Sequence, residues 1–250
     1  MMKPALAFRQ PKSPEQWQEL PNGDYIKQVL SAELETWWPK FFGYHLLKIG
    51  ALSGCIATES STIKHQVKLA PSGKSADVIA DIDDLPLLEH SVDVCLLAHA
   101  LEFTVDPHHV VREADRVLIP NGYLVITGYN PFSFAGLNKL VPFRRQQLPW
   151  NERFFSPLRV KDWLHLMGYE ILSDSRHIHS MLAKSSELGV VGQTWQQLCD
   201  NFFSRLGSIY IIVAKKRQHP LTPIKPKWRI RPKFQPVKVS PMNSSNKINQ

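Results

Sequence analysis

Residues 80–128 decide the fold; they read ADIDDLPLLEHSVDVCLLAHALEFTVDPHHVVREADRVLIPNGYLVITG. Two apolar runs, residues 92–98 and 123–128, flank a helical pattern that covers residues 106–118. Short apolar, β-branched runs on either side of one amphipathic helix are typical of a parallel strand–helix–strand unit that is buried on both faces. Ligands of open α/β sheets bind beyond the carboxyl ends of the strands. His99, which directly follows the first run, is therefore the first candidate for function.

Further strands and helices are predicted on both sides of this stretch. We expect strands at residues 44–49, 64–70, 76–80, 169–172 and 208–214, and helices at residues 23–38, 157–167 and 193–203, with a short helix from Ser13 or Pro14. The interval from Cys55 to Ile63 has room for about two helical turns. Gly50–Gly54 is a glycine-bearing turn, which allows a ligand to approach the backbone. The aromatic residues at positions 37, 38, 41 and 42 are interpreted as core packing, with the wall of a substrate pocket as the alternative.

The net charge of +8 belongs to the C-terminal tail. Residues 216–250 hold nine Lys or Arg and no Asp or Glu, so residues 1–215 carry a net charge of −1. The tail also holds six prolines and little hydrophobic patterning, and we predict that it is disordered. A weak, non-specific contact of this tail with RNA, a membrane surface or ribosomes is one interpretation, and a purely solubilising tail is the other.

The three cysteines, Cys55, Cys95 and Cys199, are widely spaced and odd in number, which predicts neither a disulfide framework nor a metal site. No apolar run reaches the ~20 residues that a membrane span needs. The first residues lack the apolar core of a secretory signal. Together these features predict a cytoplasmic protein without a bound metal.

Segments between Tyr44 and Ala214 resemble, in order, the class I S-adenosylmethionine-dependent methyltransferases of the "type 11" group, which includes ubiquinone- and biotin-pathway enzymes. The similar segments are Leu46–Gly54 (first strand and glycine loop), Ala80–Leu87 (the G-D-A-E-D-L-P-F turn), Ser91–Val94 (S-F-D-V), residues 106–126 (fourth helix, P-G-G turn and fifth strand) and residues 155–171. The overall likeness is to uncharacterised proteobacterial members of the group.

The resemblance implies an α/β, Rossmann-like fold with a mostly parallel seven-stranded sheet and helices on both faces. It implies a methyltransferase domain at residues 44–215, preceded by a helical extension at 1–43 that packs on the core and followed by the tail at 216–250. The implied cofactor is S-adenosyl-L-methionine, and the implied activity is methyl transfer to an unknown acceptor, which we expect to be a small molecule.

The resemblance also implies a set of cofactor-binding residues: Gly50, Ala51, Gly54, Asp81, Ile82, Asp83, Ala98 and His99. In this comparison the glycines flank the methionine part of the cofactor, Asp81 contacts adenine and Ile82 packs beside its ring. His99 faces the sulfonium and the substrate, where it is the candidate catalytic base. The turns after the first, third and fourth strands are thus expected to converge into one cleft.

The chain departs from the family pattern at several positions. Lys48 stands where the first strand has an acid, and Leu52 replaces the middle glycine of the loop. Lys68 lies near the expected ribose-binding acid, for which Glu59 is a substitute by sequence distance alone. These departures keep a second hypothesis open, in which the chain is a methyltransferase-like scaffold or RNA-associated module without catalysis. A nicotinamide-dependent enzyme is the weaker third hypothesis, because no G-x-G-x-x-G follows the first strand.

Several other polar residues have two interpretations. His99 either accepts a proton from the acceptor or only packs at a strand end. His108-His109 are expected to face solvent and not a metal, because adjacent helix residues point apart. The charged residues between 112 and 116 are expected to form a solvated helix face with local ion pairs. Asn130-Pro131 is either a ligand contact or a plain turn, and Arg144-Arg145 is either an anion site or a solvated pair.

Overall fold

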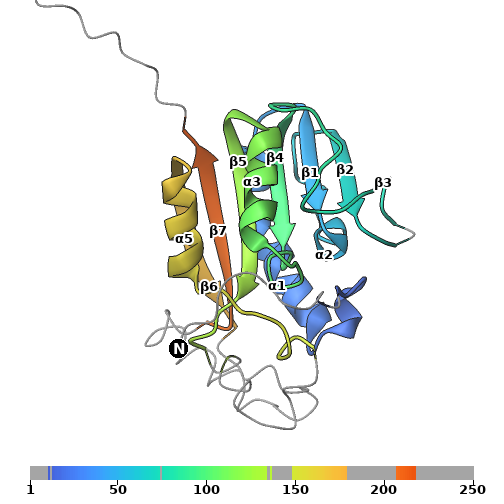
Figure 1. Ribbon diagram of the computed structural model, residues 1–250, viewed down its shortest axis with the longest axis vertical. Helices are drawn as coiled ribbons and strands as arrows, with labels where there is room; N and C mark the ends of the chain where they lie inside the picture. The colour runs from blue at the N-terminus through green and yellow to red at the C-terminus, as the bar shows by residue number, and fades with distance from the viewer. Residues whose placement is uncertain are drawn as a thin grey trace, which may run out of the picture. The chain divides into compact units, whose positions relative to one another are not determined.

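The computed structural model describes residues 11, 13–73, 75–133, 136, 148–178 and 207–217. The predicted helix at 193–203, Cys199, Arg144-Arg145 and the tail from 218 onward lie outside the described residues. Seven strands form one sheet in the order β3-β2-β1-β4-β5-β7-β6 (Figure 1). They are β1 (His45–Ile49), β2 (His65–Ala70), β3 (Val78–Ile79), β4 (Val92–Ala98), β5 (Leu118–Tyr129), β6 (Tyr169–His177) and β7 (Ile209–Lys216). The first five pair in parallel and β7 is antiparallel to both neighbours, which confirms the predicted fold class.

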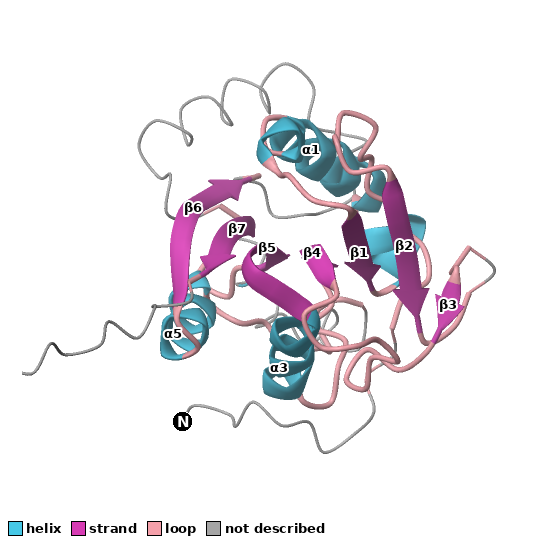
Figure 2. Cartoon of the chain, turned by 90° about the horizontal axis from the view of Figure 1, so that it is seen from above, coloured by secondary structure: helices cyan, strands magenta, loops and turns pink. Residues whose placement is uncertain are grey.

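Helices lie on both faces of the sheet (Figure 2). Helix α1 (Gly23–Glu35) covers one face, and α3 (Pro107–Val117) and α5 (Pro157–Leu166) cover the other. Each strand contributes side chains to the hydrophobic cores on both faces of the sheet, because its successive side chains point to opposite sides. Leu46 packs in the core beneath α1, whereas its neighbour Leu47 packs in the core beneath α3 and α5.

The starts of α3 and α5 follow from their capping residues. Asp106 accepts hydrogen bonds from the backbone N–H groups of His108 (3.0 Å) and His109 (3.2 Å), and Ser156 Oγ accepts one from Arg159 N at 3.3 Å. Each cap is followed by a proline at the first helical position, where its missing N–H has no cost. The sequence therefore predicted both starts correctly.

Three local predictions were wrong. The β1–β2 connection holds only the four-residue α2 (Ala51–Gly54), and residues 55–64 contain no helix. Helix α1 ends at Glu35, followed by a short 3₁₀ turn at Trp38–Lys40. Strand β5 runs through Pro120-Asn121-Gly122 instead of beginning after it. The pairing of β5 with β4 shifts its register between Val92 and Val94, and this irregularity accommodates the three residues within the strand. Asn121 adopts a left-handed φ of 65°, which asparagine tolerates.

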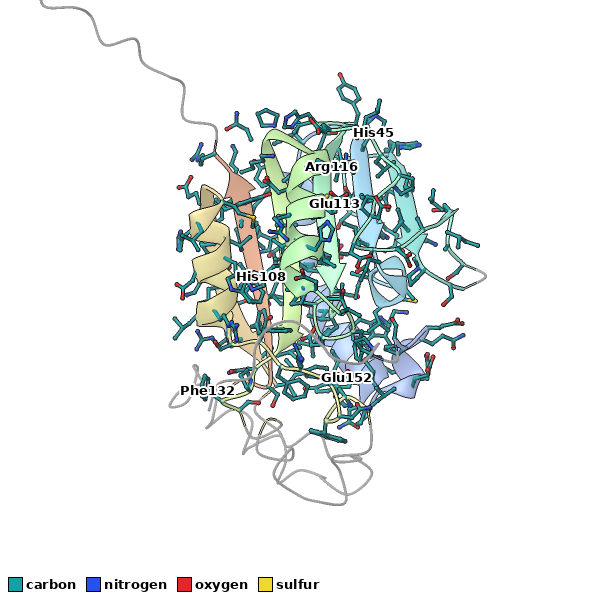
Figure 3. The ribbon with its side chains drawn as sticks, in the orientation of Figure 1. His45, His108, Glu113, Arg116, Phe132 and Glu152 are labelled. Atoms are coloured by element: carbon teal, nitrogen blue, oxygen red, sulfur yellow. The ribbon has the colours of Figure 1, made fainter. Side chains whose placement is uncertain are left out.

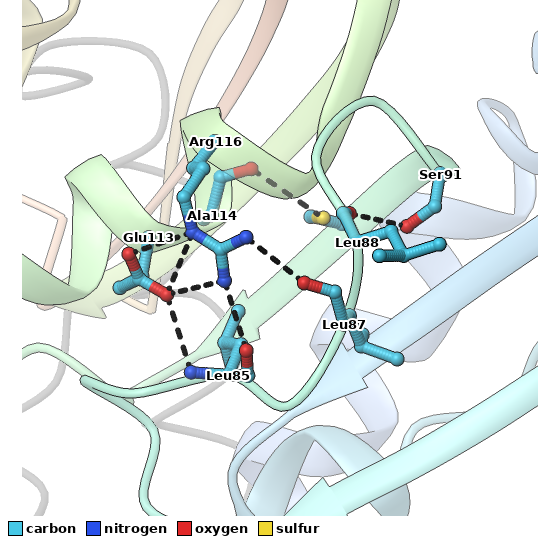
Figure 4. A network of polar contacts seen from close by, with 8 residues as sticks. Leu85, Leu87, Leu88, Ser91, Glu113, Ala114 and Arg116 are labelled. Carbon is cyan, nitrogen blue, oxygen red and sulfur yellow. Dashed lines mark hydrogen bonds and ion pairs between the residues drawn. The ribbon is translucent and has the colours of Figure 1, made fainter.

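The charged face of α3 is not simply solvated (Figure 4). Arg116 forms an ion pair with Glu113 at 2.8 Å and donates to the carbonyl oxygens of Leu85 (2.8 Å) and Leu87 (2.9 Å). Glu113 in turn accepts a hydrogen bond from Leu85 N, and these bonds lower the pKa of its carboxyl group. The expected local ion pair is thus present. Because this pair also fixes the turn after β3 to α3, the prediction of a simply solvated face was wrong.

Candidate cofactor site

The glycine loop after β1 is fixed to both neighbouring strands. Gly50 N donates to Leu69 O of β2 at 2.8 Å. Ser53 Oγ donates to Ile49 O at 2.6 Å and accepts from Ala98 N of β4 at 2.7 Å. Gly50 has φ 91°, a conformation that side-chain-bearing residues rarely adopt. The loop therefore presents bare, rigid backbone at the carboxyl edge of the sheet.

A cavity of about 410 Å³ lies beside this loop. It is lined by Gly50, Ala51 and Gly54, by Lys68–Ala70 at the end of β2, and by the turn at Ser72–Gly73. Residues Glu15–Gln18 of the N-terminal segment close its remaining side, together with Lys27 of α1. Its volume falls in the range of ~300–1,000 Å³ that small-molecule sites occupy.

A second, much smaller void of about 10 Å³ shares Gly50 and Ala51 with the larger cavity. Ile82, Ala98 and His99 also line this void, so the turns after β1, β3 and β4 do converge as expected. The expected cleft is nearly filled, however, and Ser13 of the N-terminal segment is among the residues around it. Asp81 is exposed, and neither Asp81 nor Asp83 lines either of these two cavities.

Residues Ser13–Leu20, hereafter the N-terminal strap, are held firmly on this edge. Trp17 and Leu20 are buried, and Trp17 Nε1 donates to Leu52 O of the glycine loop at 3.1 Å. Gly23, at the start of α1, lies so close that a Cβ there would be 1.6 Å from Trp17 O. The strap thus packs between the glycine loop and α1, and its 3₁₀ turn at Trp17–Glu19 replaces the short helix predicted from Ser13 or Pro14.

His99 is completely buried under the strap. Its ring lies edge-on to Trp17 with a centroid distance of 5.5 Å, and 4.3 Å from the ring of Tyr129 at the end of β5. Its φ of 51° is strained for a residue with a side chain. Nδ1 lies 3.7 Å from the buried Glu102 carboxylate, and neither ring nitrogen has a hydrogen-bond partner among the described residues. Such unpaired, buried polar atoms are typical of sites that take up water or a ligand.

Glu102 connects His99 to two buried tyrosines. Its Oε1 accepts a hydrogen bond from Tyr129 N at 2.7 Å, and its Oε2 has no partner within the described parts of the chain. Burial, and to a smaller extent the Glu102 charge, raise the pKa values of the Tyr129 and Tyr210 hydroxyls. Both tyrosines are therefore protonated at any physiological pH and can act only as neutral hydrogen-bonding groups.

Comparison with known proteins assigns the chain to a family. A family profile described as "Methyltransferase domain" matches residues 47–126. The chain is 43% identical over 221 residues, 88% of both chains, to the uncharacterized protein YafS of Escherichia coli K12. The chain belongs to the YafS family of methyltransferase-domain proteins. It is also 27% identical over 130 residues, 43% of this chain, to 56% of the demethylmenaquinone methyltransferase of Chlamydia pneumoniae.

Among solved structures, a SAM-dependent methyltransferase from Thermotoga maritima, described as a possible histamine N-methyltransferase, is similar to this YafS-family chain. The similarity covers 81% of this chain and 100% of the other, with a TM-score of 0.53 and 20% identity. At that level of identity the match shows the shared fold. In this chain the fold is a seven-stranded sheet in which the antiparallel strand β7 lies between β5 and β6.

Lys48, the main departure of this YafS-family chain from the pattern, points away from both cavities. Its Nζ donates to Ile56 O at 3.0 Å and to Thr58 Oγ1 at 2.7 Å. Burial, assisted by the nearby Lys68 charge, lowers its pKa from 10.5 to about 8. Lys48 therefore anchors the irregular β1–β2 connection and does not line either cavity beside the glycine loop.

The remaining candidates have structural roles. The Asn130 amide donates to Gly207 O at 3.0 Å and its Oδ1 accepts from Phe132 N, so this residue anchors a turn. His109 is exposed as expected, whereas His108 packs on Trp163 with a centroid distance of 4.0 Å. Cys95 is buried, which raises the pKa of its thiol. Figure 3 shows Phe132 and Glu152 at the end of the sheet where β4 finishes, and His45 at the opposite end, away from the site.

Trp17 and Leu20 were expected from the sequence to be anchors of the N-terminal segment, and both are buried. Sequence reasoning missed the contact of the strap with the glycine loop, and it missed Glu102. The contacts of Trp17 with the glycine loop join residues 35 positions apart, and no local pattern encodes them. The one available signal for Glu102 was its spacing, three residues after His99 on the same turn. The described residues contain no group of three or more metal-binding side chains. No helix within them is long and apolar enough to cross a bilayer.

Proposed function

We propose that the chain is a cytoplasmic S-adenosylmethionine-dependent methyltransferase that acts on a small molecule. The observation that carries the proposal is the rigid glycine loop with a ligand-sized cavity beside it, in a chain whose family carries a methyltransferase domain. The similarity to an enzyme named demethylmenaquinone methyltransferase supports a small-molecule acceptor. The domain boundaries at 43/44 and 215/216 and the weak RNA contact of the tail stay predictions.

The residues beside the larger cavity fit the methionine part of the cofactor. A Cβ at Gly50 would meet only Ala100, at 3.6 Å, so it is the backbone conformation that requires glycine there. We assign Gly50, Ala51 and Gly54 to the methionine part and Ile82 and Ala98 to the adenosyl part. Asp81 and Asp83, which line neither cavity in this structure, are assigned to polar contacts with the adenosyl part. S-adenosylmethionine supplies an electrophilic methyl group on a sulfonium. The chain's task is then to orient the acceptor and to exclude water.

His99 is assigned the role of proton acceptor. Its nitrogens are buried and unpaired among the described residues, beside the void that Gly50 also lines. An acceptor hydroxyl or amine that binds there would donate its proton to the imidazole. The Glu102 carboxylate, 3.7 Å from Nδ1, would stabilise the resulting imidazolium.

The non-catalytic alternative has one observation in its favour. The void at the junction of the three turns holds about 10 Å³, so a ligand can reach His99 only if some of the residues around this void move. A scaffold protein with a permanently closed site would keep this arrangement. The two hypotheses differ in whether the cofactor binds.

Isothermal titration of the full chain with S-adenosylhomocysteine tests the proposal. We expect saturable binding, lost or strongly weakened in Gly50→Val and retained in His99→Gln. His99→Gln should keep cofactor affinity and lose transfer once an acceptor is found. Absence of heat and of a thermal shift at millimolar ligand would overturn the proposal in favour of the scaffold. Binding of NAD instead would support the nicotinamide enzyme.

A further inference from the structure

The end of β2, which lines the larger cavity, lacks the acidic residue that would bind the ribose of a nucleoside. In doubly wound α/β folds an acid at the end of the second strand, roughly 20 residues after the glycine turn, binds the ribose hydroxyls. Here Ala70 stands 20 residues after Gly50, at the last position of β2. The two residues that follow β2, Pro71 and Ser72, are also uncharged.

The neighbouring acids of the β1–β2 connection and of the turn after β3 do not fill this place. Glu59, the substitute considered from the sequence, does not line the cavity. Asp77, before β3, accepts a hydrogen bond from Lys68 N at 2.9 Å and also lies outside the lining. Asp81 and Asp83 are absent from the lining as well.

One carboxylate does lie there, and it comes from the N-terminal strap. Glu15 of the N-terminal strap lines the cavity, and its Oε1 accepts a hydrogen bond from Ser72 Oγ at 3.0 Å. This contact joins residues 57 positions apart and brings the carboxylate to the end of β2. Its Oε2 has no partner among the residues that the structure describes. A free oxygen on a held carboxylate can accept hydrogen bonds from a diol.

The backbone of Glu15 is well positioned for such a role. Pro14 and Trp17 on either side of it are buried, and the N–H groups of Glu15 and Gln16 donate to Glu19 Oε1 at 2.9 and 3.1 Å. The strap is therefore fixed while the Glu15 side chain stays exposed on the cavity. Lys27 and Lys68 also line the cavity, so a carboxylate there is favoured electrostatically.

We propose that Glu15, from a distant segment of the same chain, supplies the carboxylate that the end of β2 lacks. This carboxylate binds the ribose hydroxyls of the cofactor. The inference rests on the proposed function. It makes the N-terminal strap a wall of the cofactor site and Glu15 a binding residue. Ser72 acts as a positioning residue that directs one carboxylate oxygen and leaves the other to the ligand.

Titration calorimetry of the full chain tests this assignment with two ligands, S-adenosylhomocysteine and its 2′-deoxyribose analogue. The wild type should bind the ribose form about tenfold or more tightly than the deoxy form, as the loss of one charged hydrogen bond predicts. Glu15→Gln should weaken binding of the ribose form by about the same factor and bind the two forms nearly equally. Glu35→Gln, at an exposed glutamate at the end of α1, is the matched control and should behave as the wild type.

The outcomes separate the two claims. If the wild type binds neither ligand, the proposed function and this assignment both fail. If the wild type binds and Glu15→Gln discriminates the two ligands equally well, only the Glu15 assignment is overturned. Unfolding of the ligand-free variants should occur at the wild-type temperature, because Glu15 is exposed, and this measurement excludes a folding defect as the cause of lost binding.

Discussion

Replacing Lys48 with methionine should change how the stability of the protein depends on pH. Lys48 is 4% exposed, and its pKa in the folded protein is about 8 against 10.5 for an unburied lysine. Between these two values the unfolded chain holds a proton that the folded protein has lost. The free energy of unfolding of the wild type therefore rises with pH in this window. Methionine fills similar space and does not titrate.

The expected size follows from the two pKa values. From about pH 7 to about pH 9.5 the Lys48 contribution raises the free energy of unfolding by about 2 kcal/mol. We expect the wild type to gain this amount relative to Lys48→Met over that interval. Hydrogen bonds lost from Ile56 and Thr58 shift the variant's stability at every pH, so the difference between the two pH values isolates the titration.

Urea denaturation followed by circular dichroism at both pH values measures the effect. Lys64→Met, at an exposed lysine just before β2, is the matched control and should keep the wild-type pH dependence. A constant difference between wild type and Lys48→Met across the interval would refute the reasoning. Such a result would mean that the ammonium group is hydrated in the folded protein.

Three further predictions concern the site and its supports. Gly50→Ala should cost about 1–3 kcal/mol in denaturation experiments, because φ 91° is strained for alanine, and should also weaken S-adenosylhomocysteine binding in calorimetry. Gly23→Ala should displace the strap, because the added Cβ would lie 1.6 Å from Trp17 O. Limited proteolysis should then cleave the variant near residue 17 faster than the wild type, and an unchanged cleavage rate would contradict this. Arg116→Met should destabilise by about 1–3 kcal/mol through loss of its ion pair and carbonyl contacts, while Arg112→Met, at an exposed position on the same helix, should unfold like the wild type.

Much of the fold could be predicted because its signals are local. The apolar runs of β4 and β7 and the capping residues Asp106 and Ser156 act over a few positions, so their strands and helix starts were read correctly. The course of β5 could not be predicted from the sequence, because proline, asparagine and glycine in a row normally indicate a turn. Pairing with the neighbouring strands carries β5 through that turn, and this is a tertiary effect.

The candidate site was predictable only in its outline. The meeting of Gly50, Ile82 and His99 follows from the rule that parallel strands place their carboxyl ends at one edge. The filling of that edge by Trp17 and the approach of Glu15 to Ser72 depend on a segment more than 30 residues away from the glycine loop. Sequence spacing suggested Glu59 instead, since it measures distance along the chain and not across the sheet.

The four-residue α2 has a practical consequence for anyone who handles this protein. Because the helix after β1 is so short, residues that precede the recognisable domain line the cavity beside the glycine loop. An expression clone trimmed to begin at residue 44 would retain every strand of the sheet but discard Glu15, Gln16, Trp17, Gln18 and Lys27 from the cavity. Inactivity of such a shortened protein would say nothing about the activity of the full chain.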